Sequence, residues 1–196
     1  MNYLKRCPWS EGSEEYIKYH DEEWGVPVFD DKTLFEFLTL ETAQAGLSWS
    51  TILKRRKNYK KAYDNYDIIK IASYDEKKIE ELVNNEGIIR YRLKIESSIN
   101  NAKQFLKVQD EYGSFSDYLW SFVDHYPVVN SWNKLSEVPA ESELSKKIAK
   151  DLKSKGFKFV GSVTIYAYLQ AVGVVNDHLI DCFRYKEIKD SYNKLF

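Results

Sequence analysis

The chain has 196 residues, 43% of them apolar, and its 29 Lys and Arg nearly balance its 30 Asp and Glu. This length can bury one sizeable core, and the formal charge of −1 excludes a polyanion surface that covers the whole molecule. No apolar run approaches the roughly 18 residues that span a bilayer, and segment 1–10 lacks the apolar middle of a signal peptide. We therefore expect a soluble, cytoplasmic protein with no membrane partner.

Turn residues divide the chain into a series of helices, and no clear alternation typical of strands appears, so we predict an all-α fold. Thr33 and Glu36 have the spacing of a capping box at the start of a helix over 34–45, which Gly46 interrupts. A helix with a strongly basic side follows over 48–63. Its charge run is either a DNA contact or an ordinary solvated face.

Ser73 and Glu76 form a second capping-box pattern, for a helix that ends at Gly87. Further helices are predicted over 91–112, 114–126, 143–155, 162–172 and 174–185. No internal repeat or linker divides the chain, so we expect a single domain over 1–196, in which 186–196 is either a helix or a loose C-terminal tail.

Two cysteines at opposite ends of the chain are not the framework of a small disulfide-rich domain, so we expect free thiols or metal ligands. His178 and Cys182 lie four residues apart in a predicted helix and would share one face, and Cys7 and His20 could complete the set. Two thiolates and two imidazoles suit tetrahedral Zn²⁺ and leave no position for a catalytic water, which makes such a zinc structural. Alternatively, these residues are ordinary buried thiols and histidines.

The first fifty residues are rich in aromatic side chains and also contain Glu41 on an apolar helix face. Most aromatic residues fill cores, which is the first interpretation. The second is a pocket whose rings stack on an extruded base while the carboxylate binds its edge. A buried ionised carboxylate without a partner is costly, so Glu41 needs one. The aromatic residues are Trp9, Tyr16, Tyr19, Trp24 and Trp49.

Segment 155–161 joins two predicted helices through a short turn with Gly156 and Gly161 near its ends. Backbone N–H groups of a helix–hairpin–helix turn can bind a DNA phosphate, and Lys158 adds positive charge. An ordinary helix connection with a glycine C-cap is the alternative interpretation.

Seven motifs in order, RCPW, YHDEEWGVP, LETAQAGLSWSTILKRR, GIIRYRLKI, SFVDHYP, KGFKFVG and QAVGVVNDHLIDC, resemble the DNA-3-methyladenine glycosylase I family. The resemblance spans about Cys7 to Cys182. It implies the fold of helix–hairpin–helix glycosylases, with one structural zinc that joins the N- and C-terminal segments. Its implied ligands are Cys7, His20, His178 and Cys182.

The resemblance also implies an activity and a substrate. Such an enzyme, which we expect to be a monomer, flips 3-methyladenine out of alkylated double-stranded DNA and hydrolyses the N-glycosidic bond. It releases free 3-methyladenine and leaves an abasic site. Val163 stands where lyase-type relatives carry a nucleophilic lysine, so lyase activity is not expected. Gly46 and Leu47 correspond to a loop that fills the gap left by the flipped nucleotide.

The implied base pocket contains Glu41, with Tyr16, Tyr19 and Trp49 as its walls and Trp9 and Trp24 nearby. Methylation at N3 gives adenine a positive charge, which cation–π stacking favours. We hypothesise a catalytic role for Glu41 in addition to base recognition. Two rival functions remain: a zinc-stabilised module that binds DNA without cutting it, and a zinc hydrolase that acts on a small molecule.

Overall fold

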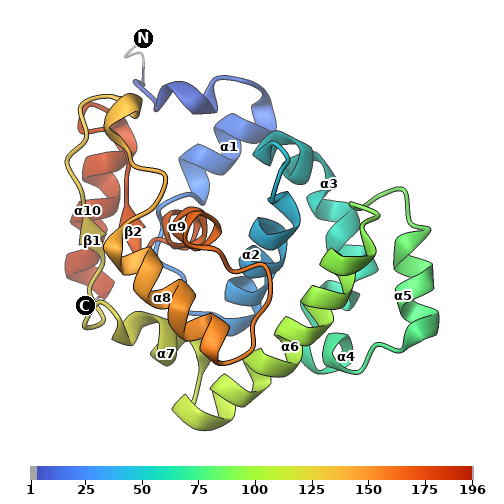
Figure 1. Cartoon of the computed structure of the whole chain (residues 1–196). Helices are drawn as coiled ribbons and strands as arrows, with labels where there is room; N and C mark the ends of the chain where they lie inside the picture. Colours follow the sequence, from blue (N-terminus) through green and yellow to red (C-terminus); the bar gives the residue numbers. More distant parts are fainter. Residues whose placement is uncertain (1–3, 196) are drawn as a thin grey trace.

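The computed structural model describes residues 4–195 and is built mostly from helices (Figure 1). The α-helices are α1 (Glu14–Glu22), α2 (Asp31–Gln44), α3 (Trp49–Ala62), α4 (Ile68–Ala72), α5 (Glu76–Val83), α6 (Arg92–Tyr112), α7 (Phe115–Ser121), α8 (Glu143–Ser154), α9 (Ser162–Ala171) and α10 (Phe183–Leu195). Three short 3-10 helices are η1 (Pro8–Ser10), η2 (Asp64–Tyr66) and η3 (Leu135–Glu137). The mostly helical fold is confirmed. Of the predicted domain 1–196, residues 1–3 and 196 lie outside the described part.

Two short strands depart from the all-α expectation. Strand β1 (Val128–Val129) pairs in parallel with β2 (Val175–Asn176), with Val128 opposite Val175. Each strand has only two residues, which is too short for an alternating pattern to appear in the sequence. The predicted absence of strands was therefore wrong at this point.

Aspartates, rather than the predicted capping boxes, start two of the helices. Asp30 caps α2 by accepting a hydrogen bond of 2.8 Å from the backbone N–H of Thr33. Asp75 caps α5 in the same way through the N–H of Lys78. The predicted starts at Thr33 and Ser73 were wrong because Asp30 and Asp75 occupy the N-cap positions, while the hydroxyl of Ser73 donates to the carbonyl of Lys70 at the end of α4. The predicted start of α8 at Glu143 is confirmed, and Ser142 caps this helix by accepting a hydrogen bond from the N–H of Ser145.

Helix α9 lies in the middle of the molecule, packed between α2 and α8 (Figure 1). Its residues Ile165 and Leu169 are fully buried, and the hydroxyl of Tyr168 donates a hydrogen bond to the carbonyl of Leu34 in α2. Helix α6 packs against α2, α4, α5 and α7. The apolar faces of α2 and α9 therefore form the centre of one continuous core.

A glycine after α9 brings the N-terminal segment close to the end of this helix. Gly173 has φ +71°, and a Cβ atom there would lie 2.3 Å from the backbone carbon of Val26. The N–H of Val28 donates to the carbonyl of Val172, and that of Gly25 donates to the carbonyl of Gln170. Only glycine permits both this conformation and this close approach.

Segment 186–195, predicted as a helix or a loose tail, forms most of α10, in which Ile188 and Tyr192 are buried. Among residues 4–195, no helix combines the length and the apolar composition that crossing a membrane requires.

Candidate functional site

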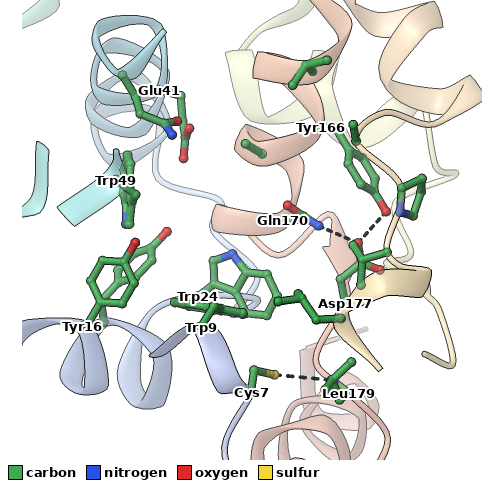
Figure 2. Close-up of a pocket in the computed structure, with 18 residues that line it drawn as sticks. Cys7, Trp9, Tyr16, Trp24, Glu41, Trp49, Tyr166, Gln170, Asp177 and Leu179 are labelled. Atoms are coloured by element: carbon green, nitrogen blue, oxygen red, sulfur yellow. Dashed lines mark hydrogen bonds between the residues drawn. The ribbon is translucent and has the colours of Figure 1, made fainter. Parts of the chain in front are cut away.

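A cavity of about 320 Å³ opens between the N-terminal helices and α9 (Figure 2). One side of it consists of aromatic rings and one carboxyl group, and we call this side the aromatic wall. The rings are in mutual contact: the centroids of Trp9 and Trp24 lie 4.9 Å apart, and those of Tyr19 and Trp49 lie 5.4 Å apart. All six residues that the sequence placed in a pocket line this cavity, namely Trp9, Tyr16, Tyr19, Trp24, Glu41 and Trp49.

Glu41 is buried in this wall and lacks the partner that the sequence led us to expect. Its side chain extends from α2, the residue is only 4% exposed, and no group in residues 4–195 hydrogen-bonds its Oε2 atom. Burial raises the pKa of this carboxyl group to about 8. Burial therefore favours the neutral carboxylic acid, which can donate one hydrogen bond and accept others.

Trp49 contributes a second unsatisfied polar atom to the aromatic wall. Its Nε1–H group is buried without a hydrogen-bond partner among the described residues. Buried polar groups are nearly always satisfied, and an exception at a cavity indicates a missing ligand or water. Trp49 and Glu41 together therefore mark this cavity as a binding site for a molecule with polar groups.

The opposite side of the cavity was not predicted. We call Tyr166, Gln170 and Asp177 the polar wall; Val163 and segment 135–140 complete this side. In the sequence, Tyr166 belongs to the apolar helix SVTIYAYLQA, whose pattern indicates only a core helix. Gln170 lies near the end of this helix and begins the motif QAVGVVNDHLIDC, in which only His178 and Cys182 were predicted to have a role. Asp177 adjoins the predicted metal ligand His178 and had no predicted role of its own.

Four side chains of metal-binding type lie close together, and we call them the Cys/His cluster: Cys7, His20, His178 and Cys182. Their ligand atoms all lie within 4.8 Å of one another, and all four residues are buried. The Sγ atom of Cys182 lies 3.4 Å from Nε2 of His20 and 3.6 Å from Nδ1 of His178. A tetrahedral ion with S and N ligands requires such separations to be about 3.5 Å. The cluster therefore could hold a metal ion.

The local geometry of the cluster differs from the sequence prediction in one respect. His178 and Cys182 do not lie in a helix but in the turn between β2 and α10, where the N–H of Cys182 donates to the carbonyl of Leu179. The predicted helix over 174–185 was wrong because β2 pairs with β1 and the turn follows it. The turn, rather than a helical face, brings the two side chains together.

The imidazole rings of the cluster are oriented by hydrogen bonds on their far sides. Nδ1 of His20 lies 2.7 Å from Oδ1 of Asp21, and Nε2 of His178 lies 2.9 Å from the carbonyl oxygen of Trp24. Both oxygens accept, so each ring carries its proton there and directs its other nitrogen toward the thiols. A hydrogen bond from the thiol of Cys7 lowers the pKa of Cys182, and both histidines lower it further. The orientation of the rings suits a metal site, whereas the hydrogen bond to Cys182 and burial raise the pKa of Cys7, so an ion would have to displace the proton of that thiol.

Gly46 and Leu47 form the turn between α2 and α3, beside the mouth of the cavity. Gly46 has φ +80°, and Leu47 is 40% exposed. The residues on either side of this turn, Gln44 and Trp49, both line the cavity. The turn therefore presents an exposed apolar side chain next to the cavity entrance.

Helices α8 and α9 pack against each other and are joined by the turn 155–161, which α6 holds in place. Asn101 both accepts from the N–H and donates to the carbonyl of Lys158, and the amide of Asn100 donates to Gly156. Lys158 is exposed, and Gly161 is the N-cap of α9. Lys155, in contrast, is paired with Glu111.

Comparison with known proteins decides which class of protein this site belongs to. The family model for methyladenine glycosylases matches residues 9–185. The chain belongs to the methyladenine glycosylase family. These proteins are glycosidases, so the chain is a member of a hydrolase class of enzymes.

Relatives of known sequence match almost the whole methyladenine glycosylase chain. A DNA-3-methyladenine glycosylase 1 from Escherichia coli K12 is 46% identical over 182 residues, which cover 93% of this chain and 97% of that protein. A DNA-3-methyladenine glycosylase from Haemophilus influenzae Rd is 47% identical and covers 90% of this chain and 96% of its own length.

Solved structures have the same fold as this methyladenine glycosylase. A crystal structure of 3-methyladenine DNA glycosylase I superimposes with a TM-score of 0.88 at 46% identity and covers 91% of this chain and 98% of that one. A Staphylococcus aureus structure described as showing the basis of 3-methyladenine recognition has a TM-score of 0.88 at 37% identity, with 92% and 96% coverage.

Proposed function

We propose that this chain excises 3-methyladenine from alkylated double-stranded DNA by hydrolysing the N-glycosidic bond. The observation that carries this proposal is the buried, unpartnered carboxyl group of Glu41 in a cavity lined by aromatic rings. A cavity of this kind suits a flipped purine, which stacks on rings and hydrogen-bonds through its edge. The names of the relatives indicate that this purine is 3-methyladenine.

Recognition rests on the positive charge of the methylated base. The rings of Trp49 and Tyr19 offer cation–π stacking, which a neutral adenine exploits less well. Glu41 binds the edge of the base. Beside a cation its carboxyl group loses its proton more readily, so the ionised carboxylate also favours the positively charged base. Extrusion costs roughly a few kcal/mol, and stacking recovers about 1–3 kcal/mol per base, so these contacts decide which bases remain flipped.

Bond cleavage needs little acid catalysis because the charged base is already a good leaving group. We assign to Glu41 the further role of stabilising positive charge on the sugar or orienting water. The described lining of the cavity includes no lysine, and Val163 occupies the position of the lyase nucleophile. We therefore propose a monofunctional enzyme that releases free 3-methyladenine and leaves an abasic site.

DNA contacts are proposed at two turns. Leu47, beside the cavity mouth, would fill the space of the extruded nucleotide, and Gly46 gives its turn the required backbone conformation. In the second turn, a helix–hairpin–helix element, the backbone between Gly156 and Gly161 would bind a phosphate, with Lys158 adding charge.

Zn²⁺ is the ion that best suits the Cys/His cluster, because two thiolates and two imidazoles are its preferred structural ligand set. Cys7, His20, His178 and Cys182 would hold it and fill all four positions, so it would tie the two ends of the chain together and supply no reaction chemistry. We also propose that residues 1–196 act as one monomeric domain. The relatives named above come from bacteria, whose DNA lies in the cytoplasm, and we propose the same location for this chain.

The deciding experiment is the release of free bases from methylated duplex DNA, analysed by chromatography. We expect selective release of 3-methyladenine, which Glu41→Gln and Trp49→Ala reduce strongly while both variants remain folded. The matched control is Glu86→Gln, since Glu86 is exposed and lies outside the cavity lining. Duplex binding without base release by the folded, zinc-loaded protein would instead establish the non-catalytic module.

A further inference from the structure

Asp177 is the centre of the polar wall. Its Oδ1 accepts hydrogen bonds from Nδ2 of Asn130 at 2.6 Å and Nε1 of Trp132 at 2.7 Å. Its Oδ2 accepts from the hydroxyl of Tyr166 at 2.5 Å and Nε2 of Gln170 at 2.7 Å. Each oxygen thus uses both of its acceptor positions, and the residue is 2% exposed. Asp177 has no capacity left for a substrate or a water, so its role is to position its neighbours.

Gln170 is the neighbour whose chemistry this positioning decides. A glutamine amide can present either its oxygen or its nitrogen, and hydrogen-bonding partners determine which. Asp177 only accepts in this network, so the NH₂ group of Gln170 must face Asp177. The amide oxygen therefore points away from Asp177, as Figure 2 shows, toward the cavity. No donor among residues 4–195 satisfies that oxygen, and the residue is half-buried.

An acceptor fixed in this position selects a ligand with a donor. In DNA, the N9 atom of adenine is bonded to the sugar, so the exocyclic amino group carries the only N–H bonds of the base. We infer that Gln170 Oε1 accepts a hydrogen bond from the exocyclic amino group of the flipped base, and that Asp177 sets this specificity by fixing the amide. The inference deepens the proposed function and rests on it.

The polar wall is suited to this task because it is held from several directions. Asn130 and Trp132 bind Asp177 and so hold the segment that precedes Leu135 and residues 138–140, which also line the cavity. Tyr166 and Gln170 approach from α9. An acceptor fixed before the ligand arrives costs no reorganisation on binding, so it discriminates strongly against a base that presents a second acceptor there.

Two ligands that differ at this position test the inference. 3-Methyladenine has an amino donor where 3-methylhypoxanthine has a carbonyl acceptor, and quenching of the tryptophans in the aromatic wall reports the binding of either one. We expect Gln170→Met to weaken 3-methyladenine binding about fivefold and to leave 3-methylhypoxanthine binding nearly unchanged. Gln104→Met, which replaces a half-buried glutamine of α6 outside the cavity, is the matched control and should change neither.

A second variant tests the positioning by Asp177. In Asp177→Asn the new amide donates as well as accepts, so Gln170 can turn its oxygen toward residue 177 and its NH₂ toward the cavity. The preference for 3-methyladenine should then fall further than in Gln170→Met, with a gain in 3-methylhypoxanthine binding. Should Asp177→Asn not fold, the Gln170→Met comparison decides alone.

Two results would overturn the inference: equal losses for both ligands in Gln170→Met, or no loss for either ligand. If the second result came with slower base release, the amide oxygen would bind a water instead. Failure of the proposed function is distinct, because the unsubstituted protein would then neither bind 3-methyladenine nor release it from DNA.

Discussion

The Nζ atom of Lys94 lies 2.6 Å from the carbonyl oxygen of Ala45 and, in addition, 2.8 Å from that of Ala43. Lys94 extends from α6 and so caps the C-terminal end of α2, where carbonyl groups lack helical partners and a positive charge is favourable. The next two residues are Gly46 and Leu47. Lys94 therefore fixes the turn that presents Leu47 beside the cavity.

Lys94→Met should loosen this turn without altering the cavity. We expect 3-methyladenine release from duplex DNA to fall about tenfold while binding of the free base is unchanged. The loss should be smaller for single-stranded substrate, in which extrusion costs less. Lys103→Met, at an exposed position on the same helix, is the control. An equal loss on single- and double-stranded DNA would argue against a role in extrusion.

Glu41→Gln should raise stability in a pH-dependent way. Burial raises the pKa of this carboxyl group from 4.5 to about 8, so between these values the folded protein binds more protons than the unfolded chain. The free energy of unfolding contributed by Glu41 then falls as pH rises through this window. Glutamine has no such dependence, so the variant should gain stability over the unsubstituted protein, on the order of a few kcal/mol by pH 8. Urea unfolding at pH 5, 6.5 and 8 measures it; a difference that does not grow with pH would contradict the assignment.

Cys182→Ser should abolish stoichiometric zinc binding and lower the unfolding temperature by roughly 10 °C, because the proposed metal would join the two ends of the chain. Elemental analysis and thermal unfolding measure the two effects. His125→Asn, at an exposed histidine outside the Cys/His cluster, should retain the metal. Full stability of metal-free protein would show that the cluster does not need an ion to fold.

Gly173→Ala should destabilise the protein by about 2 kcal/mol or more, because it combines a left-handed backbone with a Cβ atom 2.3 Å from the carbon of Val26. Gly12→Ala is a matched control, since nothing lies within 4 Å of a Cβ atom there. Chemical unfolding of both variants provides the measurement. Comparable stability of the two would mean that the contact between Gly173 and the N-terminal segment relaxes easily.

Lys158→Ala should weaken binding to duplex DNA regardless of sequence and reduce the slope of log Kd against log salt by about one. Lys155→Ala is the comparison, because that side chain lies 3.0 Å from Glu111 and is already paired. Titrations at several salt concentrations measure both slopes. A smaller salt slope for Lys158→Ala than for Lys155→Ala would support a phosphate contact at Lys158. Equal slopes for the two variants would place the DNA elsewhere.

Local patterns in the sequence were sufficient for those features that depend on nearby residues. Helical periodicity and glycine positions predicted most helices, although the caps at Asp30 and Asp75 were misplaced because several nearby polar residues fit the same pattern. The residues of the Cys/His cluster and the aromatic wall were candidates from their side-chain types, and the family resemblance selected them over the alternative of core residues; the structure brings each set together.

Other features were decided by the tertiary structure alone, because they depend on contacts between segments that are distant in the sequence. The parallel pair of Val128 and Val175, and the turn that places His178 beside Cys182, have no local signature in the sequence. The same holds for the polar wall, where the direction of the Gln170 amide follows from Asp177, and Asp177 is held by residues from two other parts of the chain. Sequence alone determined which chemical groups are present. Folding determined which of them face the cavity, because hydrogen-bond direction and burial are set by partners far away in the chain.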